Sequence, residues 1–157
     1  MKISIRKGFG FGLTSGIITT LGMIVGLDSG THMKAVVLGG IFIIAIADAL
    51  SDALGMHISE EYEAKHSRTE IWESTFATFF TKLIVALTFV VPVLLLELST
   101  AIMASIIWGL SLIIIFSYFI AKQEKANPFP VVSEHLVIAV AVVIITHFVG
   151  DLVAMLV

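Results

Sequence analysis

Five long apolar segments constrain the fold of this 157-residue chain more than any other feature of its sequence. A helix needs about 20 mainly apolar residues to cross the hydrocarbon core of a bilayer. The segments that meet this requirement are 9–27, 35–57, 75–96, 101–121 and 136–157. Such segments satisfy their backbone hydrogen bonds internally when they are helical. The sequence therefore predicts an all-α integral membrane protein, in which residues 1–157 form one domain of five transmembrane helices.

The composition agrees with this fold class. Hydrophobic residues make up 58% of the chain and charged residues 13%, whereas soluble domains have about 25% charged residues. We expect Pro128 and Pro130 to prevent any helix just before the last span. No cysteine is present, which excludes disulfides and thiolate metal sites.

The charge and the motifs narrow the classes of function. A net charge of −3 does not favour nucleic acid as a partner. The sequence has no His-Glu-x-x-His, no Gly-x-Ser-x-Gly and no P-loop. We therefore expect neither an enzyme nor a permanently bound cofactor.

The distribution of Lys and Arg predicts the orientation in the membrane. Seven of these residues fall on one side of the predicted spans: Lys2, Arg6, Lys7, Lys65, Arg68, Lys122 and Lys125. Only Lys34 falls on the other side, so the N-terminus should be cytoplasmic and the C-terminus outside. Lys82 lies inside the third span, where we expect it to extend its ammonium to the membrane surface or to pair with an acid. In a prokaryote this would be a multi-pass protein of the cytoplasmic membrane.

Two pairs of polar residues lie within predicted spans. Asp48 and Asp52 are four residues apart and share one face of the second span, which Met56 continues. His147 and Asp151 have the same spacing in the fifth span. Each charged side chain in lipid costs at least about 2.5–3.5 kcal/mol and commonly marks an ion or proton pathway. These five residues are the predicted metal ligands, with Asp48 and Asp52 also coupling to protons; the alternative is that each is a satisfied structural group.

The loop between the second and third spans is rich in possible cation ligands. They are Glu60, Glu63, His66, Glu70 and Glu73. We expect the second span to continue as a short cytoplasmic acidic helix over about 58–73, with Glu60, Glu63 and His66 collecting metal for the pathway. The alternative is a solvated helix face, because Lys65 and Arg68 alternate with the acids.

The first span carries two pairs of glycines, Gly12 with Gly16 and Gly22 with Gly26. Small residues at this spacing let helix backbones approach closely. They predict either packing against a helix of the same chain or the seam of a homodimer.

Four segments resemble the vacuolar iron transporter family. They are TSGIITTLGMIVGL (14–27), ADALSDALGMHISEEYE (47–63), FFTKLIVALTFVVPVLLLEL (79–98) and THFVGDLVAML (146–156). The resemblance implies five spans and a homodimer that moves Fe(II) and similar divalent ions out of the cytosol in exchange for protons. It also implies an ion pathway at the dimer interface.

This chain differs from that family at two ion-site positions. Ser15 stands where the family has an Asp, and Asp52 stands where it has a Met. The long cytoplasmic metal-binding helices of the family are shortened as well. Replacing a thioether by a carboxylate favours harder cations such as Mn(II), Mg(II) or Ca(II).

These observations together predict a transporter that exports divalent cations, Fe²⁺ or Mn²⁺, from the cytosol in exchange for protons. Its expected partners are a second copy of the chain, the lipid bilayer, the metal ions and protons. One alternative is a membrane scaffold that assembles other proteins without transport, in which the acids pair for specificity. A cation or proton channel is the other.

Overall fold

The computed structural model describes residues 2–63 and 66–156. Within these ranges the helices are α1 (Ile3–Thr31), α2 (Lys34–Tyr62), α3 (Arg68–Thr88), α4 (Val90–Leu95), α5 (Leu98–Gln123) and α6 (Pro128–Leu156). Helices α1, α2, α5 and α6, together with the consecutive pair α3–α4, form five stretches long and apolar enough to cross a membrane. The predicted all-α fold with five apolar spans is therefore confirmed, and it is consistent with a multi-pass membrane protein.

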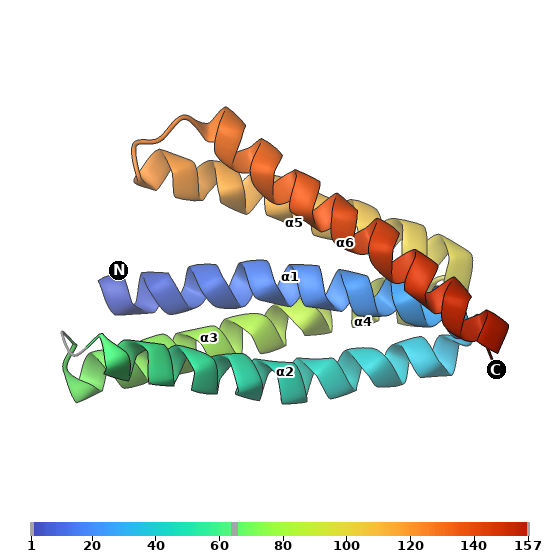
Figure 1. Cartoon of the computed structure of the whole chain (residues 1–157), viewed down its shortest axis with the longest axis horizontal. Coiled ribbons are helices and arrows are strands. Elements are labelled where there is room, and N and C mark those ends of the chain that lie inside the picture. The colour runs from blue at the N-terminus through green and yellow to red at the C-terminus, as the bar shows by residue number, and fades with distance from the viewer. Residues whose placement is uncertain (1, 64–65, 157) are drawn as a thin grey trace.

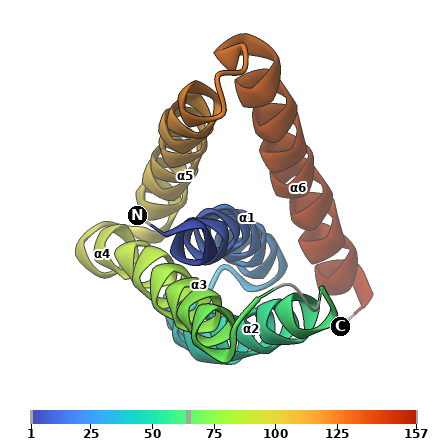
Figure 2. The ribbon, with the colours of Figure 1, turned by 90° about the vertical axis from the view of Figure 1, so that its left-hand side faces the viewer.

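Helix α1 lies at the centre of the bundle, with α2 and α3 on one side and α5 and α6 on the other (Figure 2). Its side chains Leu13, Ile17 and Leu21 are buried in the main apolar core. The α5–α6 hairpin diverges from α1 towards the loop that joins its two helices (Figure 1). Helix α6 buries only Ala139 and Gly150 among its described residues, so most of its apolar surface is free to contact lipid.

The first pair of glycines brings α1 against α3. A Cβ atom added to Gly12 would lie 2.6 Å from the carbonyl oxygen of Thr78, and one added to Gly16 would lie 3.2 Å from the Cγ of Lys82. The two helix backbones are therefore in near contact along this face.

The second pair brings α1 against α6. A Cβ atom on Gly26 would lie 3.2 Å from the carbonyl oxygen of Thr146, and one on Gly22 would also meet α6 side chains. The interpretation as packing within the chain accounts for all four glycines. At Gly12, Gly16, Gly22 and Gly26 the space beside α1 is taken by α3 and α6 of the same chain, and a dimer seam at these positions stays a prediction.

A proline divides the third span into two helices. Pro92 has no N–H to donate to the carbonyl of Thr88, four residues earlier, and its ring clashes with that carbonyl. Helix α3 accordingly ends at Thr88, and the short α4 begins at Val90. The span continues through Pro92 to Leu95, where α4 ends.

Two further prolines begin the last helix. Pro128 is the first residue of α6 and Pro130 the third, and the side chain of Asn127 accepts a hydrogen bond from the N–H of Phe129 at 3.1 Å. Our prediction that these prolines prevent a helix is wrong, because N–H groups in the first turn have no partner within the helix and proline loses nothing there.

The two ends of the bundle differ in charge. The N-terminus, the α2–α3 connection and the α5–α6 loop lie at one end, and the C-terminus lies at the other (Figure 1). Ion pairs join the first end: Lys2 contacts Glu73, and the Arg6 Nη2 lies 2.5 Å from the Glu124 Oε1. At the opposite end Lys34 donates to backbone carbonyls at the end of α4. Which end faces the cytoplasm stays a prediction.

The acidic extension differs from the expected form. Helix α2 ends at Tyr62, and Ser67 caps the start of α3 by a reciprocal pair of hydrogen bonds with Glu70. A single helix over 58–73 is therefore wrong, because this capping box starts a new helix at Arg68. Residues 64–65 of the predicted extension lie outside the described residues.

Candidate cation site

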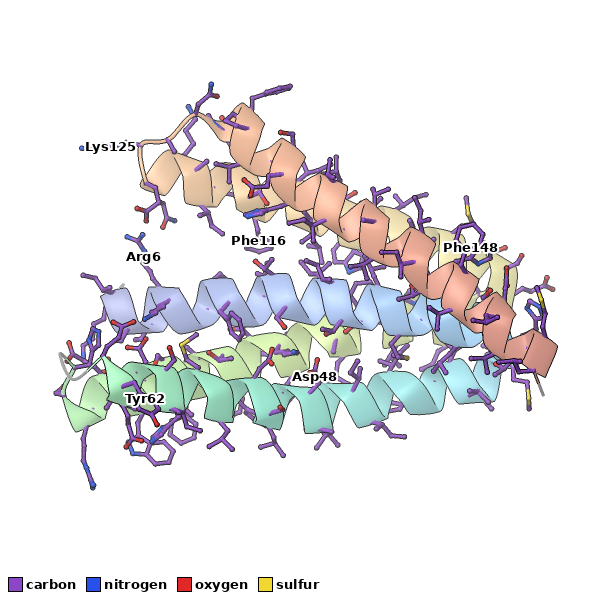
Figure 3. All side chains as sticks on the ribbon, viewed as in Figure 1. Arg6, Asp48, Tyr62, Phe116, Lys125 and Phe148 are labelled. Atoms are coloured by element: carbon purple, nitrogen blue, oxygen red, sulfur yellow. The ribbon has the colours of Figure 1, made fainter. Side chains whose placement is uncertain are left out.

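Two aspartates near the middle of α2 form the first part of the site. Asp48 and Asp52 lie on the side of α2 that faces α1 and α3, and Figure 3 shows Asp48 about midway along the helix. Their side chains are 27% and 21% exposed. Leu50 and Ile46, on the opposite side of the helix, are exposed apolar residues. The two carboxylates are therefore partly sheltered by the bundle inside a span that is otherwise apolar.

Lys82 on α3 reaches between these carboxylates. Its Nζ lies 2.5 Å from the Asp48 Oδ2 and also donates a hydrogen bond to the Asp52 Oδ2. The Lys82 side chain is only 2% exposed. The expectation that Lys82 extends to the membrane surface is wrong, and the alternative of pairing with an acid is confirmed. Two nearby carboxylates hold the ammonium more strongly than distant surface water does.

Ser15 on α1 completes the cluster. Its hydroxyl accepts a hydrogen bond from the Lys82 Nζ at 2.8 Å and donates one to the Asp52 Oδ2 at 2.6 Å. Three helices thus contribute to a single polar group. Asp48 is held less completely, because its Oδ2 has the ionic contact with Lys82 but no hydrogen-bond donor among the described residues.

The glycine at position 16 makes this arrangement possible. The Lys82 stem lies beside Gly16, where a Cβ atom would be 3.2 Å from the Lys82 Cγ and 3.3 Å from its Cα. A larger residue would push α3 or the lysine stem away from α1. The close α1–α3 packing therefore places the ammonium within reach of both Ser15 and the aspartates.

The cluster carries an unequal number of charges. When all three groups are ionised, two carboxylates and one ammonium leave a net charge of −1. An uncompensated charge is unfavourable among apolar helices. One bound proton would make the cluster neutral, whereas a divalent cation added beside the ammonium would leave a net charge of +1.

Met56 and Glu60 continue the row of Asp48 and Asp52 along α2 at intervals of four residues. Both side chains are buried, Glu60 completely. The predicted site residues on α2 therefore form one line. It runs from the middle of the bundle to the end at which α1 begins and α2 ends.

A second acidic cluster surrounds Glu60 at that end. Its Oε1 lies 2.5 Å from the Nζ of Lys7, which also contacts the Glu63 Oε1 at 2.9 Å. The His66 Nε2 lies 3.5 Å from Glu60 and 3.4 Å from Glu63. Because Lys7 donates a hydrogen bond to it, the pKa of Glu63 is held below its ordinary value.

The other two acids of this region lie elsewhere. Glu70 caps α3 through Ser67, and Glu73 binds Lys2 and Ser4. The predicted trio of Glu60, Glu63 and His66 is thus brought together without them. Lys7 was not anticipated as its partner. It lies eight residues before Ser15, about two turns along the same side of α1, and this spacing is the signal that could have identified it.

The polar pair on α6 lies far from the aspartates of α2. His147 and Asp151 are 3.6 Å apart, and the buried Ser29 of α1 donates to the His147 carbonyl at 2.9 Å and contacts the Asp151 carboxylate. Ser29 and Ser15 are fourteen residues apart on α1, about 21 Å along its axis. Within one chain the two polar pairs therefore do not converge.

A complete metal centre is not preformed in the part of the chain that the structure describes. Residues 2–63 and 66–156 contain no group of three or more His, Asp and Glu side chains placed to hold a metal ion. Metal binding by Asp48, Asp52, Met56, Glu60, Glu63, His66, His147 and Asp151 stays a prediction.

No protein-family model matches the chain, and no curated protein matches it significantly. The resemblance to the vacuolar iron transporter family thus stays an interpretation of the quoted motifs.

Proposed function

We propose that this protein is a membrane transporter that exports divalent metal cations of the Fe or Mn type from the cytosol in exchange for protons. Asp48 and Asp52 hold the cation during transport. The observation that carries this proposal is the Asp48–Lys82–Asp52 cluster. In it the buried ammonium of Lys82 bridges two carboxylates inside a bundle of apolar helices.

Three features of the cluster support cation exchange. Carboxylate and hydroxyl oxygens suit hard divalent cations, and Asp48, Asp52 and Ser15 present such oxygens to one point. The net charge of −1 favours arrival of a positive ion. The partial exposure of both aspartates leaves the cluster open on one side.

Protons compete with the metal for the same oxygens. The groups that face the two aspartates are Lys82 from α3 and Ser15 from α1. In this group only the aspartates carry carboxylate oxygens, and a proton and a metal ion cannot be bound at the same oxygen. The second cluster, at Glu60, Glu63 and His66, lies on the same face of α2 and would concentrate cations at the N-terminal end.

The test combines binding and transport with matched variants. Isothermal titration of Mn(II) and Fe(II) at pH 7.5 should show binding by the wild type. Asp52→Asn should abolish binding and proteoliposome uptake, whereas Asp28→Asn, an equal change outside the cluster, should have no effect. Absence of divalent-ion binding by the wild type would refute the proposal.

A membrane scaffold is the second candidate. The closed set of contacts among Lys82, Ser15 and Asp52 favours it, because a satisfied polar group can simply join helices. A scaffold would bind no divalent ion, and the titration above distinguishes the two. A channel would conduct cations without dependence on an imposed proton gradient.

Self-association remains part of the proposal. Because the glycines of α1 are used within the chain, a homodimer would use another surface. The molecular mass of the purified protein in mild detergent and in nanodiscs would show whether it is a dimer.

A further inference from the structure

We infer that the ammonium of Lys82 is a tethered competitor of the transported cation. It occupies the position between Asp48 and Asp52 that the cargo takes, and it must move aside before cargo can bind. This inference rests on the proposed function and adds the residue that controls affinity at that site.

The ammonium of Lys82 lies among three oxygens. The Lys82 Nζ lies 2.5 Å from the Asp48 Oδ2 and 2.8 Å from the Ser15 Oγ, and it contacts the Asp52 Oδ2. The Ser15 and Asp52 oxygens accept hydrogen bonds from the ammonium, and the Asp48 Oδ2 adds an ionic contact. Divalent cations bind protein oxygens at about 2.0–2.6 Å. A cation held by the same oxygens would therefore overlap with Nζ, and the two cannot be bound together.

The side chain of Lys82 is long and has several rotatable bonds. Lys82 is attached to α3 through a flexible stem of four methylene groups. The ammonium can leave the carboxylates by rotation within the stem while the Cα stays in place. A planar arginine side chain would be held more firmly, because it can form paired hydrogen bonds with a carboxylate.

The charge of Lys82 also affects the affinity of the site for a divalent cation. Without Lys82, a divalent cation between two carboxylates would give a neutral group in apolar surroundings, which favours tight binding and slow release. With the displaced ammonium nearby, the same state carries a net charge of +1. Lys82 therefore weakens cargo binding. A transport site benefits from this, because an ion must be able to leave as well as enter.

The decisive measurement is Mn(II) affinity by isothermal titration of the full-length protein in nanodiscs at pH 7.5. Lys82→Met should bind Mn(II) at least tenfold more tightly than the wild type, which is about 1.4 kcal/mol. Lys82→Arg should bind at least tenfold more weakly. Lys122→Met is the matched control, because Lys122 lies over the ring of Tyr118 at the end of α5, and it should leave the affinity unchanged.

Transport adds a readout that a purely structural lysine would not change. Lys82→Met should take up Mn(II) into proteoliposomes with a lower KM and a lower maximal rate, because release becomes slow. If Lys82→Met does not fold, Lys82→Arg decides: a structural role predicts wild-type affinity for this charge-conserving variant, and that result would overturn the inference. If the wild type binds Mn(II) and both Lys82 variants bind it with the same affinity as the wild type, the inference is overturned but the proposed function stands. A wild type that binds no Mn(II) would overturn both.

Discussion

The contact between α1 and α3 at Gly12 offers a sharp test of the packing. In Gly12→Ala the new Cβ would lie 2.6 Å from the carbonyl oxygen of Thr78 and 3.0 Å from its Cα. Both atoms belong to the backbone, so no side chain can rotate away. Moving the oxygen from 2.6 Å to an ordinary contact of 3.4 Å requires the helices to separate by about 0.8 Å.

The magnitude follows from this displacement. Forcing one extra methyl group into a well-packed contact costs about 1–3 kcal/mol. For a chain of this size, that corresponds to a decrease in melting temperature of roughly 2–12 °C. The same separation would stretch the hydrogen bond of 2.8 Å between Lys82 and Ser15, one turn further along α1.

Gly10→Ala is the matched control, because a Cβ atom there meets nothing within 4 Å. It changes the same residue type in the same helix and should be neutral, or stabilising by up to about 1 kcal/mol through helix propensity. Thermal unfolding in one detergent, followed by intrinsic fluorescence, compares both variants with the wild type. Equal melting temperatures for Gly12→Ala and Gly10→Ala would refute the close α1–α3 contact.

Three further predictions concern the polar contacts at the ends of the bundle. Ser29→Ala removes a buried donor to α6 and should lower the free energy of unfolding by about 1–2 kcal/mol in urea titrations. Ser67→Ala removes the cap of α3 and should cost about 1 kcal/mol in the same assay, with an unchanged value contradicting the capping box. Lys7 lowers the pKa of Glu63 in the folded protein, so this contact stabilises the protein above the ordinary glutamate pKa of 4.5, and its contribution is lost as pH falls through the lower folded value. The difference in melting temperature between wild type and Glu63→Gln should therefore be present at pH 7 and disappear at strongly acidic pH; a difference that persists there would exclude this pair as its source.

Local sequence was sufficient for the number and type of the spans. In lipid a run of about 20 apolar residues satisfies its backbone hydrogen bonds as a helix, and all five runs are helical in the structure. Ends of helices were less well predicted, because Pro128 begins a helix where we expected it to prevent one. Proline has opposite effects in the first turn and in the interior, and the sequence did not show which position it would occupy.

The glycine pairs show a different limit. Their spacing correctly indicated close helix contacts, but it did not identify the partner helix. Gly12 meets α3 and Gly26 meets α6, and both partners follow from how the whole chain folds around α1. A spacing pattern describes one surface only, whereas packing depends on two.

The sequence by itself determined that this chain forms five apolar helices and that Asp48 and Asp52 share one face of the second. Only the tertiary structure decided that Lys82 and Ser15 meet them, and that His147 and Asp151 lie elsewhere. Periodicity places residues on the face of a single helix, because that geometry repeats every 3.6 residues. Contacts between helices depend on the depth, rotation and crossing of each one. These quantities are set by the packing of all side chains together, and no local pattern specifies them.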